Sequence, residues 1–177
     1  MKIAIFSSAD SVISNNNKEL ALGIINYLKK YNVTLVTGGS LGIPGFMIEE
    51  YKKIGGNAIM YSPDPCSISH KKRHDNHDIH HYDQIIFGTG FTQRSLQMIS
   101  DVDGAIALNG RTGTLCEILI AIEESLPVIV IDSAEGVCEN FEKILSYTNK
   151  EPFGFCEIGS SYGNQIDKLI SHIKKHS

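Results

Sequence analysis

Residues 104–117 read GAIALNGRTGTLCE, and this stretch decides the fold. Its first part, Gly104–Leu108, is apolar throughout, which is typical of a strand buried on both faces of a parallel sheet. A turn containing Gly110 and Gly113 follows, and the residues from Thr112 to Glu124 have a helical pattern. A strand that enters a helix through a glycine-rich turn is the repeating unit of an α/β fold, and such a turn is a candidate phosphate-binding loop.

The same alternation of short apolar runs and helical patterns continues on both sides of this stretch. Right-handed crossovers between such strands give a Rossmann-like, doubly wound parallel sheet with helices on both faces, and we expect residues 1–177 to form one domain of this α/β class. The other expected strands are Ile3–Phe6, Val33–Val36, Ala58–Tyr61, Tyr82–Phe87 and Val128–Ile131. The other expected helices follow Ser14–Asn17 and Pro44 and cover residues 91–100, 139–147 and 165–175.

Residues 62–81 interrupt this alternation, because they show no apolar periodicity. We expect a long loop here, of the kind that is usually functional or disordered. It contains five histidines (His70, His74, His77, His80 and His81) with basic residues among them. A metal site is one interpretation of these histidines. A solvated, positively charged lid without a metal is the interpretation that we favour, since the segment lacks a helical pattern.

Composition excludes several classes of protein. The chain has 177 residues and a net charge of −4. This charge argues against a large positively charged surface that would bind nucleic acid, so no nucleic-acid partner is expected. Four scattered cysteines without a CxxC pair indicate reduced thiols in a cytosolic protein. The apolar run at residues 3–6 is too short for a signal peptide or a membrane span. We therefore expect a cytoplasmic protein with no membrane partner.

Glycine-rich turns follow several of the expected strands. In doubly wound sheets, ligands bind beyond the carboxyl ends of the strands, where small residues let backbone amides approach an anion. The turns predict one phosphate site assembled from several loops, although each glycine pair alone can be an ordinary tight turn. The candidate binding residues are Ser8, Gly38, Gly39, Ser40, Gly42, Gly45, Gly110, Arg111, Thr112, Gly113 and Thr114.

Two charged residues are candidates for chemistry at this site. Arg94 begins an expected helix, and Glu117 lies near the first turn of a helix that is otherwise apolar. Such residues are usually solvated, but a carboxylate in an apolar helix is expected to point at the pocket. The chain has no GxxxxGK[ST] motif and no GxGxxG after the first strand, which excludes a P-loop NTPase and an ordinary NAD dehydrogenase.

These residues also match a known set of motifs. Residues 109–117, NGRTGTLCE, correspond to a PGGxGTxxE motif, and residues 38–45, GGSLGIPG, correspond to GGGxxGxMG. Arg94, Met98 and Asp103 follow the arginine, methionine and aspartate that lie between the two motifs. On these residues the chain resembles the Lonely Guy family, also called "possible lysine decarboxylase" proteins, over roughly residues 1–147. Asn109 and Arg111 replace the motif's proline and glycine, as in an uncharacterised branch related to molybdenum-cofactor carrier-like proteins.

The resemblance implies a nucleoside 5′-monophosphate phosphoribohydrolase, which cleaves the N-glycosidic bond, with Arg94 and Glu117 as the catalytic pair. It implies an AMP-like nucleotide or phosphate as ligand, Met98 among the binding residues, no required cofactor, and a homodimer or higher homo-oligomer. The alternative is a carrier or sensor of a nucleotide-derived ligand without turnover, which Arg111 and the missing proline favour. Lysine decarboxylation is rejected, because no lysine for pyridoxal phosphate lies in the glycine turns or beside Arg94.

Overall fold

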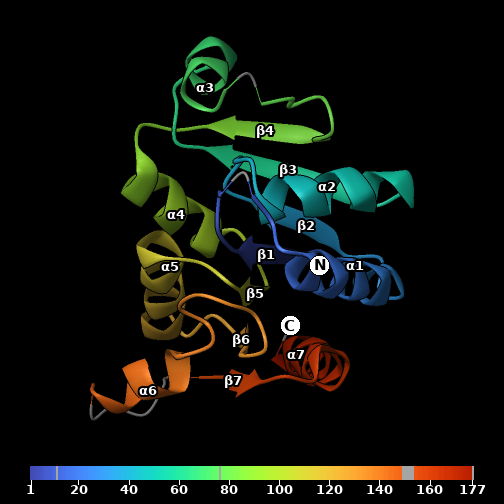
Figure 1. Cartoon of the computed structure of the whole chain (residues 1–177), viewed down its shortest axis with the longest axis vertical. Helices are drawn as coiled ribbons and strands as arrows, with labels where there is room; N and C mark the ends of the chain where they lie inside the picture. The colour runs from blue at the N-terminus through green and yellow to red at the C-terminus, as the bar shows by residue number, and fades with distance from the viewer. Residues whose placement is uncertain (11, 76, 149–153, 177) are drawn as a thin grey trace.

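The computed structural model describes residues 1–10, 12–75, 77–148 and 154–176, which form an α/β fold (Figure 1). The strands are β1 (Lys2–Phe6), β2 (Thr34–Thr37), β3 (Asn57–Ser62), β4 (Gln84–Phe87), β5 (Gly104–Leu108), β6 (Val128–Ile131) and β7 (Cys156–Gly159). The helices are α1 (Asn15–Lys29), α2 (Ile43–Lys53), α3 (Ser67–Arg73), α4 (Phe91–Ser100), α5 (Thr112–Glu123), α6 (Phe141–Ser146) and α7 (Tyr162–His176).

The strands described form one parallel sheet in the order β4-β3-β2-β1-β5-β6-β7. The chain moves outward from β1 to β4, then returns to place β5 on the other side of β1, so the direction of winding reverses between β1 and β5. This confirms the predicted doubly wound sheet. Because ligands bind at such a switch point, beyond the carboxyl ends of the strands, the topology directs attention to the loops after β1 and β5.

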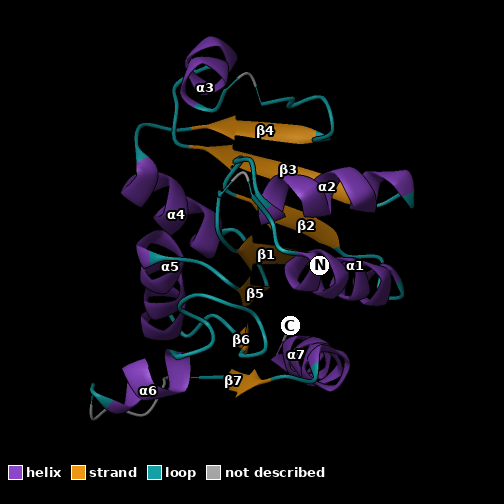
Figure 2. Cartoon of the chain, viewed as in Figure 1, coloured by secondary structure: helices purple, strands orange, loops and turns teal. Residues whose placement is uncertain are grey.

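Each face of the sheet is covered by a layer of helices (Figure 2). Ile3 and Ile5 of β1 belong to the core beneath α1, α2 and α7, whereas Ala4 and Phe6 belong to the core beneath α4, α5 and α6. Strands buried on both faces need apolar side chains at every position, which explains the continuous apolar runs in the sequence. The prediction of helices on both faces is confirmed.

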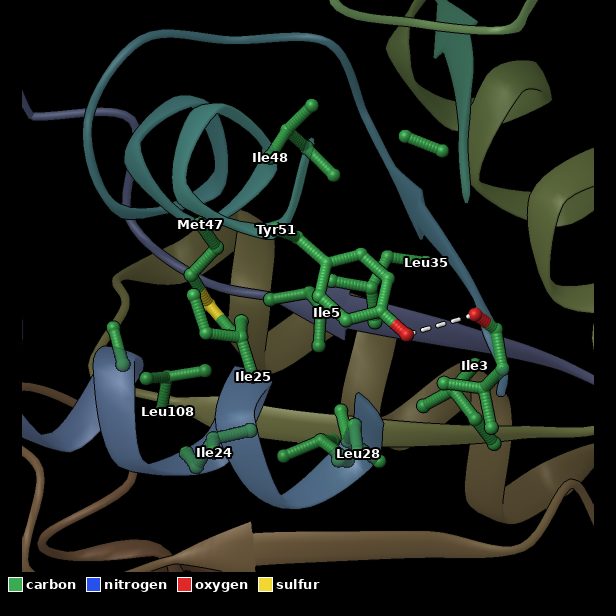
Figure 3. Packing of buried hydrophobic residues seen from close by; sticks show 14 of the residues in the cluster. Ile3, Ile5, Ile24, Ile25, Leu28, Leu35, Met47, Ile48, Tyr51 and Leu108 are labelled. Atoms are coloured by element: carbon green, nitrogen blue, oxygen red, sulfur yellow. Dashed lines mark hydrogen bonds between the residues drawn. The ribbon is translucent and has the colours of Figure 1, made fainter. Parts of the chain in front are cut away.

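Figure 3 shows the packing between α2 and the sheet. Tyr51 of α2 is fully buried among aliphatic side chains, and its hydroxyl donates a hydrogen bond to the carbonyl of Val33 at 2.9 Å. The ring lies so close to Gly56 that a Cβ atom there would meet it at 2.1 Å. A glycine at position 56 is therefore needed to make room for the Tyr51 ring. The ring can then stay buried with its one polar atom, the hydroxyl, hydrogen-bonded to Val33.

Two predictions about local structure are wrong. Residues 62–81 are not only a loop, because they contain α3, whose inward residue His70 is polar and so left no apolar stripe in the sequence. A seventh strand, β7, was missed because its sequence, CEIG, contains a glutamate and a glycine and so shows no apolar run.

Candidate functional site

A cavity of about 280 Å³ lies at the carboxyl end of the sheet. Its walls come from the loops after β1 and β2, the first turns of α4 and α5, and the end of α3. These loops converge because parallel strands present their carboxyl ends at the same sheet edge. Of the predicted site residues, the ones that line this cavity are Ser8, Gly38, Ser40, Arg94, Arg111, Gly113, Thr114 and Glu117.

Other predicted residues lie beneath or beside the cavity. Gly39 faces Met60, and the side chain of Met98 is fully buried below Arg94. Gly42 has a positive φ of 76°, and a Cβ atom there would meet the backbone oxygens of Ser8 and Asp10 at 2.6 Å. This glycine therefore lets the loop after β2 pack against the loop after β1.

Three more of the predicted glycine-turn residues lie outside the cavity. Gly45 packs close to the carbonyl of Ser40, where a Cβ atom would stand 3.0 Å from that oxygen. Gly110 and Thr112 line neighbouring hollows around the same turn. These three residues shape the loops that form the site.

The cavity floor contains a buried ion pair between two neighbouring helices. Arg94 Nη1 on α4 donates to Glu117 Oε1 on α5 at 2.9 Å, and the side chains are 12% and 11% exposed. Ser95 Oγ donates to the same carboxylate oxygen at 2.9 Å. Gly38 makes room for the guanidinium, because a Cβ atom there would stand 2.1 Å from Arg94 Nη1. Arg94 and Glu117 were predicted to be near each other, and the structure brings them into contact.

A second ion pair lies at the mouth of the cavity. Arg111 Nη2 is 2.5 Å from Asp10 Oδ1, and the two side chains are 75% and 42% exposed. Ser8 Oγ donates to the other oxygen of Asp10 at 2.7 Å. Exposed pairs of this kind contribute about 0–1 kcal/mol to stability, so an incoming anion can compete with Asp10 for the guanidinium.

The N-terminus of α5 faces the same space. Arg111 is its N-cap residue, and no side chain among the described residues caps the helix. Gly113 has no atom within 4 Å of the position where its Cβ would stand, so the first turn is open. Uncapped backbone amides and the helix dipole together attract an anion. The arrangement suits a phosphate group beside Arg111.

A group of buried histidines lies next to the cavity wall. His70 and His77 are buried, and their ring nitrogens are 3.3 Å apart, whereas His74 is partly exposed and lines the cavity. Burial lowers the pKa of His70 to about 4, with a further contribution from His74, and burial also lowers the pKa of His74 and of His77. These imidazoles are neutral at neutral pH, so the expected positively charged lid is not formed by them.

Sequence reasoning missed two residues of the site: Asp10 holds Arg111, and Ser95 holds Glu117. His74, which was named among the histidines of the expected lid, forms part of the cavity wall. Asp10 had a usable signal, because it follows the first strand at the edge where ligands bind. Ser95 had none, since its role depends on which helix faces which.

A larger cavity, of about 620 Å³, lies at the other end of the sheet. It is lined by Val102 and Asp103, which precede β5, by Leu126 and Pro127, which precede β6, and by the end of α7. Ligand sites of doubly wound sheets lie at the carboxyl ends of the strands, and this cavity is at their amino ends. The smaller cavity is therefore the candidate site.

Comparison with known proteins gives the family. The model of the SLOG cluster4 family matches residues 1–152, and the chain belongs to that family. The more specific assignment to the Lonely Guy family is not confirmed. None of the curated proteins compared with the chain matches it significantly.

Several solved structures share the fold at low identity. The molybdenum cofactor carrier protein from Chlamydomonas reinhardtii is 19% identical, covers 98% of both chains and has a TM-score of 0.73. The molybdenum cofactor binding protein from the phototrophic bacterium Rippkaea orientalis is 18% identical, covers 96% of both chains and has a TM-score of 0.71. DNA processing protein A from Helicobacter pylori is 20% identical, covers 97% of this chain and 80% of its own, and has a TM-score of 0.64.

These structures correct two expectations. The expectation that no cofactor is required is not supported, because proteins with this fold include a carrier and a binding protein of the molybdenum cofactor. The expectation of no nucleic-acid partner is likewise unsupported by the fold, since the Helicobacter pylori protein is described by its single-stranded DNA binding mode. Within the described ranges, no helix has both the length and the apolar character needed to cross a bilayer.

Proposed function

We propose that this member of the SLOG cluster4 family binds a phosphate-bearing, nucleotide-derived ligand and acts as its carrier or sensor. The observation that carries the proposal is the convergence of Arg111 and the uncapped α5 N-terminus on one cavity at the switch point of the sheet. Backbone amides and a guanidinium are the groups that bind a terminal phosphate. The Arg111–Asp10 pair is exposed enough to open for that phosphate.

A phosphorylated pterin of the molybdenum-cofactor type fits these residues. The α5 N-terminus and Arg111 suit its phosphate, and Phe91, which is 54% exposed and lines the cavity, offers a ring face to a flat heterocycle. Two solved structures with this fold belong to proteins named as carriers or binders of that cofactor. In a carrier the cofactor keeps its own redox chemistry for the enzyme that receives it, and this chain's residues hold and shield it.

The test is to identify what the protein binds. Untagged protein is purified, its small molecules are extracted and identified by mass spectrometry, and the extracted compound is titrated back onto the protein. We expect a phosphorylated heterocycle whose affinity falls at least tenfold in Arg111→Ala and is unchanged in Lys143→Ala, a control on exposed α6. Equal binding by wild type and Arg111→Ala, or a bound ligand without phosphate, would contradict the proposal.

Hydrolysis of a nucleoside monophosphate is a second candidate function, and the Arg94–Glu117 pair favours it. A carboxylate next to the ribose can stabilise an oxocarbenium-like transition state or activate water, and Arg94 can neutralise charge on the leaving base. Incubation with a panel of nucleoside monophosphates tests this by release of free base. Release that Glu117→Gln abolishes, while nucleotide binding persists, would establish the hydrolase in place of the carrier.

A further inference from the structure

The histidine-rich segment contains a short helix that puts two imidazoles on one side. His70 and His74 are four residues apart, His70 inside α3 and His74 directly after it. Residues at this spacing lie on one face of a helix, one turn apart. Their ring centroids are 4.5 Å apart, and the side chain of His70 is fully buried.

A carboxylate from another element meets this pair. Asp64, which follows β3, is 2% exposed, and its Oδ2 lies 3.8 Å from His70 Nδ1 and 3.7 Å from His74 Nε2. The three candidate ligand atoms all lie within 4.8 Å of one another. Ligands about 2.0–2.1 Å from a tetrahedral ion stand about 3.4 Å apart. To complete such a site, the two contacts of Asp64 Oδ2 would shorten by about half an ångström, and the widest of the three separations by up to about 1.4 Å.

Two of these atoms have no hydrogen-bond partner. Asp64 Oδ2 and His74 Nε2 are buried, and neither forms a hydrogen bond with any described residue. Leaving a buried polar atom unpaired is costly, and one that belongs to a carboxylate is especially so. The two atoms face each other at a distance too long for a hydrogen bond. An ion between them would satisfy both.

We propose that Asp64, His70 and His74 bind a divalent transition-metal ion, for which Zn²⁺ is the natural probe. Two imidazole nitrogens and one carboxylate oxygen suit Zn²⁺ and similar ions, whereas Mg²⁺ and Ca²⁺ prefer oxygen ligands alone. The proposal is independent of the ligand in the main cavity.

The surroundings of the three residues match those of metal ligands. His70 Nε2 is 3.3 Å from His77 Nδ1, and His70 Nδ1, the nitrogen that faces Asp64, is 2.9 Å from Ser62 Oγ. An ion bound at Nδ1 would take the place of Ser62 as the partner of this nitrogen. Arg73 Nε donates to Asp64 Oδ1 at 2.7 Å and leaves Oδ2 free for the ion. Outer contacts of this kind orient metal ligands and fix the histidine tautomer.

The site adjoins the candidate ligand cavity. His74 lines that cavity together with Arg94 and Phe91. Three protein ligands leave at least one coordination position open in a tetrahedral or larger shell. Because His74 also lines the cavity, an ion bound to it would lie near any small molecule bound there.

Metal binding by the untagged, chelator-treated protein tests the proposal. Equilibrium dialysis followed by elemental analysis should give about one tightly bound Zn²⁺ per chain, and Zn²⁺ should raise the Tm, whereas Mg²⁺ should do neither. Co²⁺ should bind at the same place and give a visible absorption band that Zn²⁺ removes. Absence of tight Zn²⁺ binding to the folded wild-type protein would overturn the proposal.

Variants locate the ion. Asp64→Asn and His74→Ala should each weaken Zn²⁺ binding more than about 100-fold, because each removes a ligand. His80→Ala removes an exposed histidine of the same segment, and His172→Ala breaks the other histidine pair, on α7, so both should bind like wild type. If Asp64→Asn does not fold, His74→Ala decides, since His74 is partly exposed. Binding that survives His74→Ala, or is lost in His172→Ala, contradicts this site.

Discussion

Arg94 and Glu117 join the two helices that start from opposite sides of the switch point. Arg94 Nη1 is 2.9 Å from Glu117 Oε1, although the residues belong to α4 after β4 and α5 after β5. β4 is at the edge of the sheet and β5 is next to β1, yet α4 and α5 lie side by side (Figure 1). The ion pair therefore holds together, at the floor of the cavity, two helices whose preceding strands are not neighbours in the sheet.

Replacing Glu117 with glutamine should leave Arg94 buried without its charge partner. Loss of one member of a fully buried pair costs about 3–5 kcal/mol, and the open cavity beside this pair reduces the expected loss to about 1–3 kcal/mol. Urea unfolding measures the change, with Glu139→Gln as a control at an exposed position. Equal stabilities of Glu117→Gln and wild type would show that the pair does not hold α4 against α5.

Gly38 and Gly113 should respond differently to alanine, although both line the cavity. A Cβ atom at Gly38 would stand 2.1 Å from Arg94 Nη1, whereas one at Gly113 would have no neighbour within 4 Å. Gly38→Ala should displace Arg94 from Glu117 and lower stability. Gly113→Ala should keep the stability of wild type or gain up to about 1 kcal/mol, because alanine favours helix. Thermal unfolding of both variants checks this, and equal effects would contradict the assigned contacts.

Asp10 should restrain Arg111 in the free protein. Asp10→Asn keeps an acceptor for Ser8 but removes the charge that holds the guanidinium. We expect phosphate-bearing ligands to bind about 2–10-fold more tightly to this variant at low salt, with a smaller gain at high salt. Isothermal titration at two salt concentrations measures it. Weaker binding by Asp10→Asn would mean that Asp10 contacts the ligand directly.

The fold was predictable because its signals are local. Strands buried on both faces must be apolar throughout, so β5 (Gly104–Leu108) and β6 (Val128–Ile131) were predicted with the bounds that the structure has. β7 has only partly buried residues and gave a weaker signal. The strand order depends on contacts between distant segments, and only the general class of topology followed from the alternation of strands and helices.

The site was predictable where a charged side chain lies near the start of a helix that follows a strand. Arg94 lies in the first turn of α4 after β4, and Glu117 in the second turn of α5 after β5, so the topology alone brings them to one edge. His70 and His74 were singled out in the sequence, where a metal site was one interpretation of the histidines, but Asp64 was not, because its place beside them depends on tertiary contacts. A polar helix face that packs inward is indistinguishable in sequence from a solvated one.

Asp83 should make part of the stability depend on pH. A hydrogen bond from Lys52, aided by one from the Ala58 amide, holds the pKa of Asp83 below its ordinary value of 3.8. A carboxylate with a lowered pKa stabilises the fold above the unfolded pKa, and this contribution is lost as the pH falls through the folded value. Asp83→Asn should therefore be less stable than wild type at pH 7 and lose that difference below about pH 3.8. A constant difference in urea unfolding across this range would contradict the assignment.

The outer face of α4 and α5 should mediate the expected homodimer. Leu96 on α4 is 45% exposed, and Leu115, Leu119 and Ile120 on α5 are only partly buried. A second copy that covered this face would gain about 25 cal/mol of stabilisation for each Å² of apolar surface removed from water. Wild type should therefore elute as a dimer in size-exclusion chromatography with light scattering, and Leu96→Glu should shift it toward monomer because the interface would bury a charge. Ile68→Glu is the matched control, because Ile68 is 79% exposed on α3, away from this face. A monomeric wild type, or a dimer that Leu96→Glu leaves intact, would show that α4 does not form the interface.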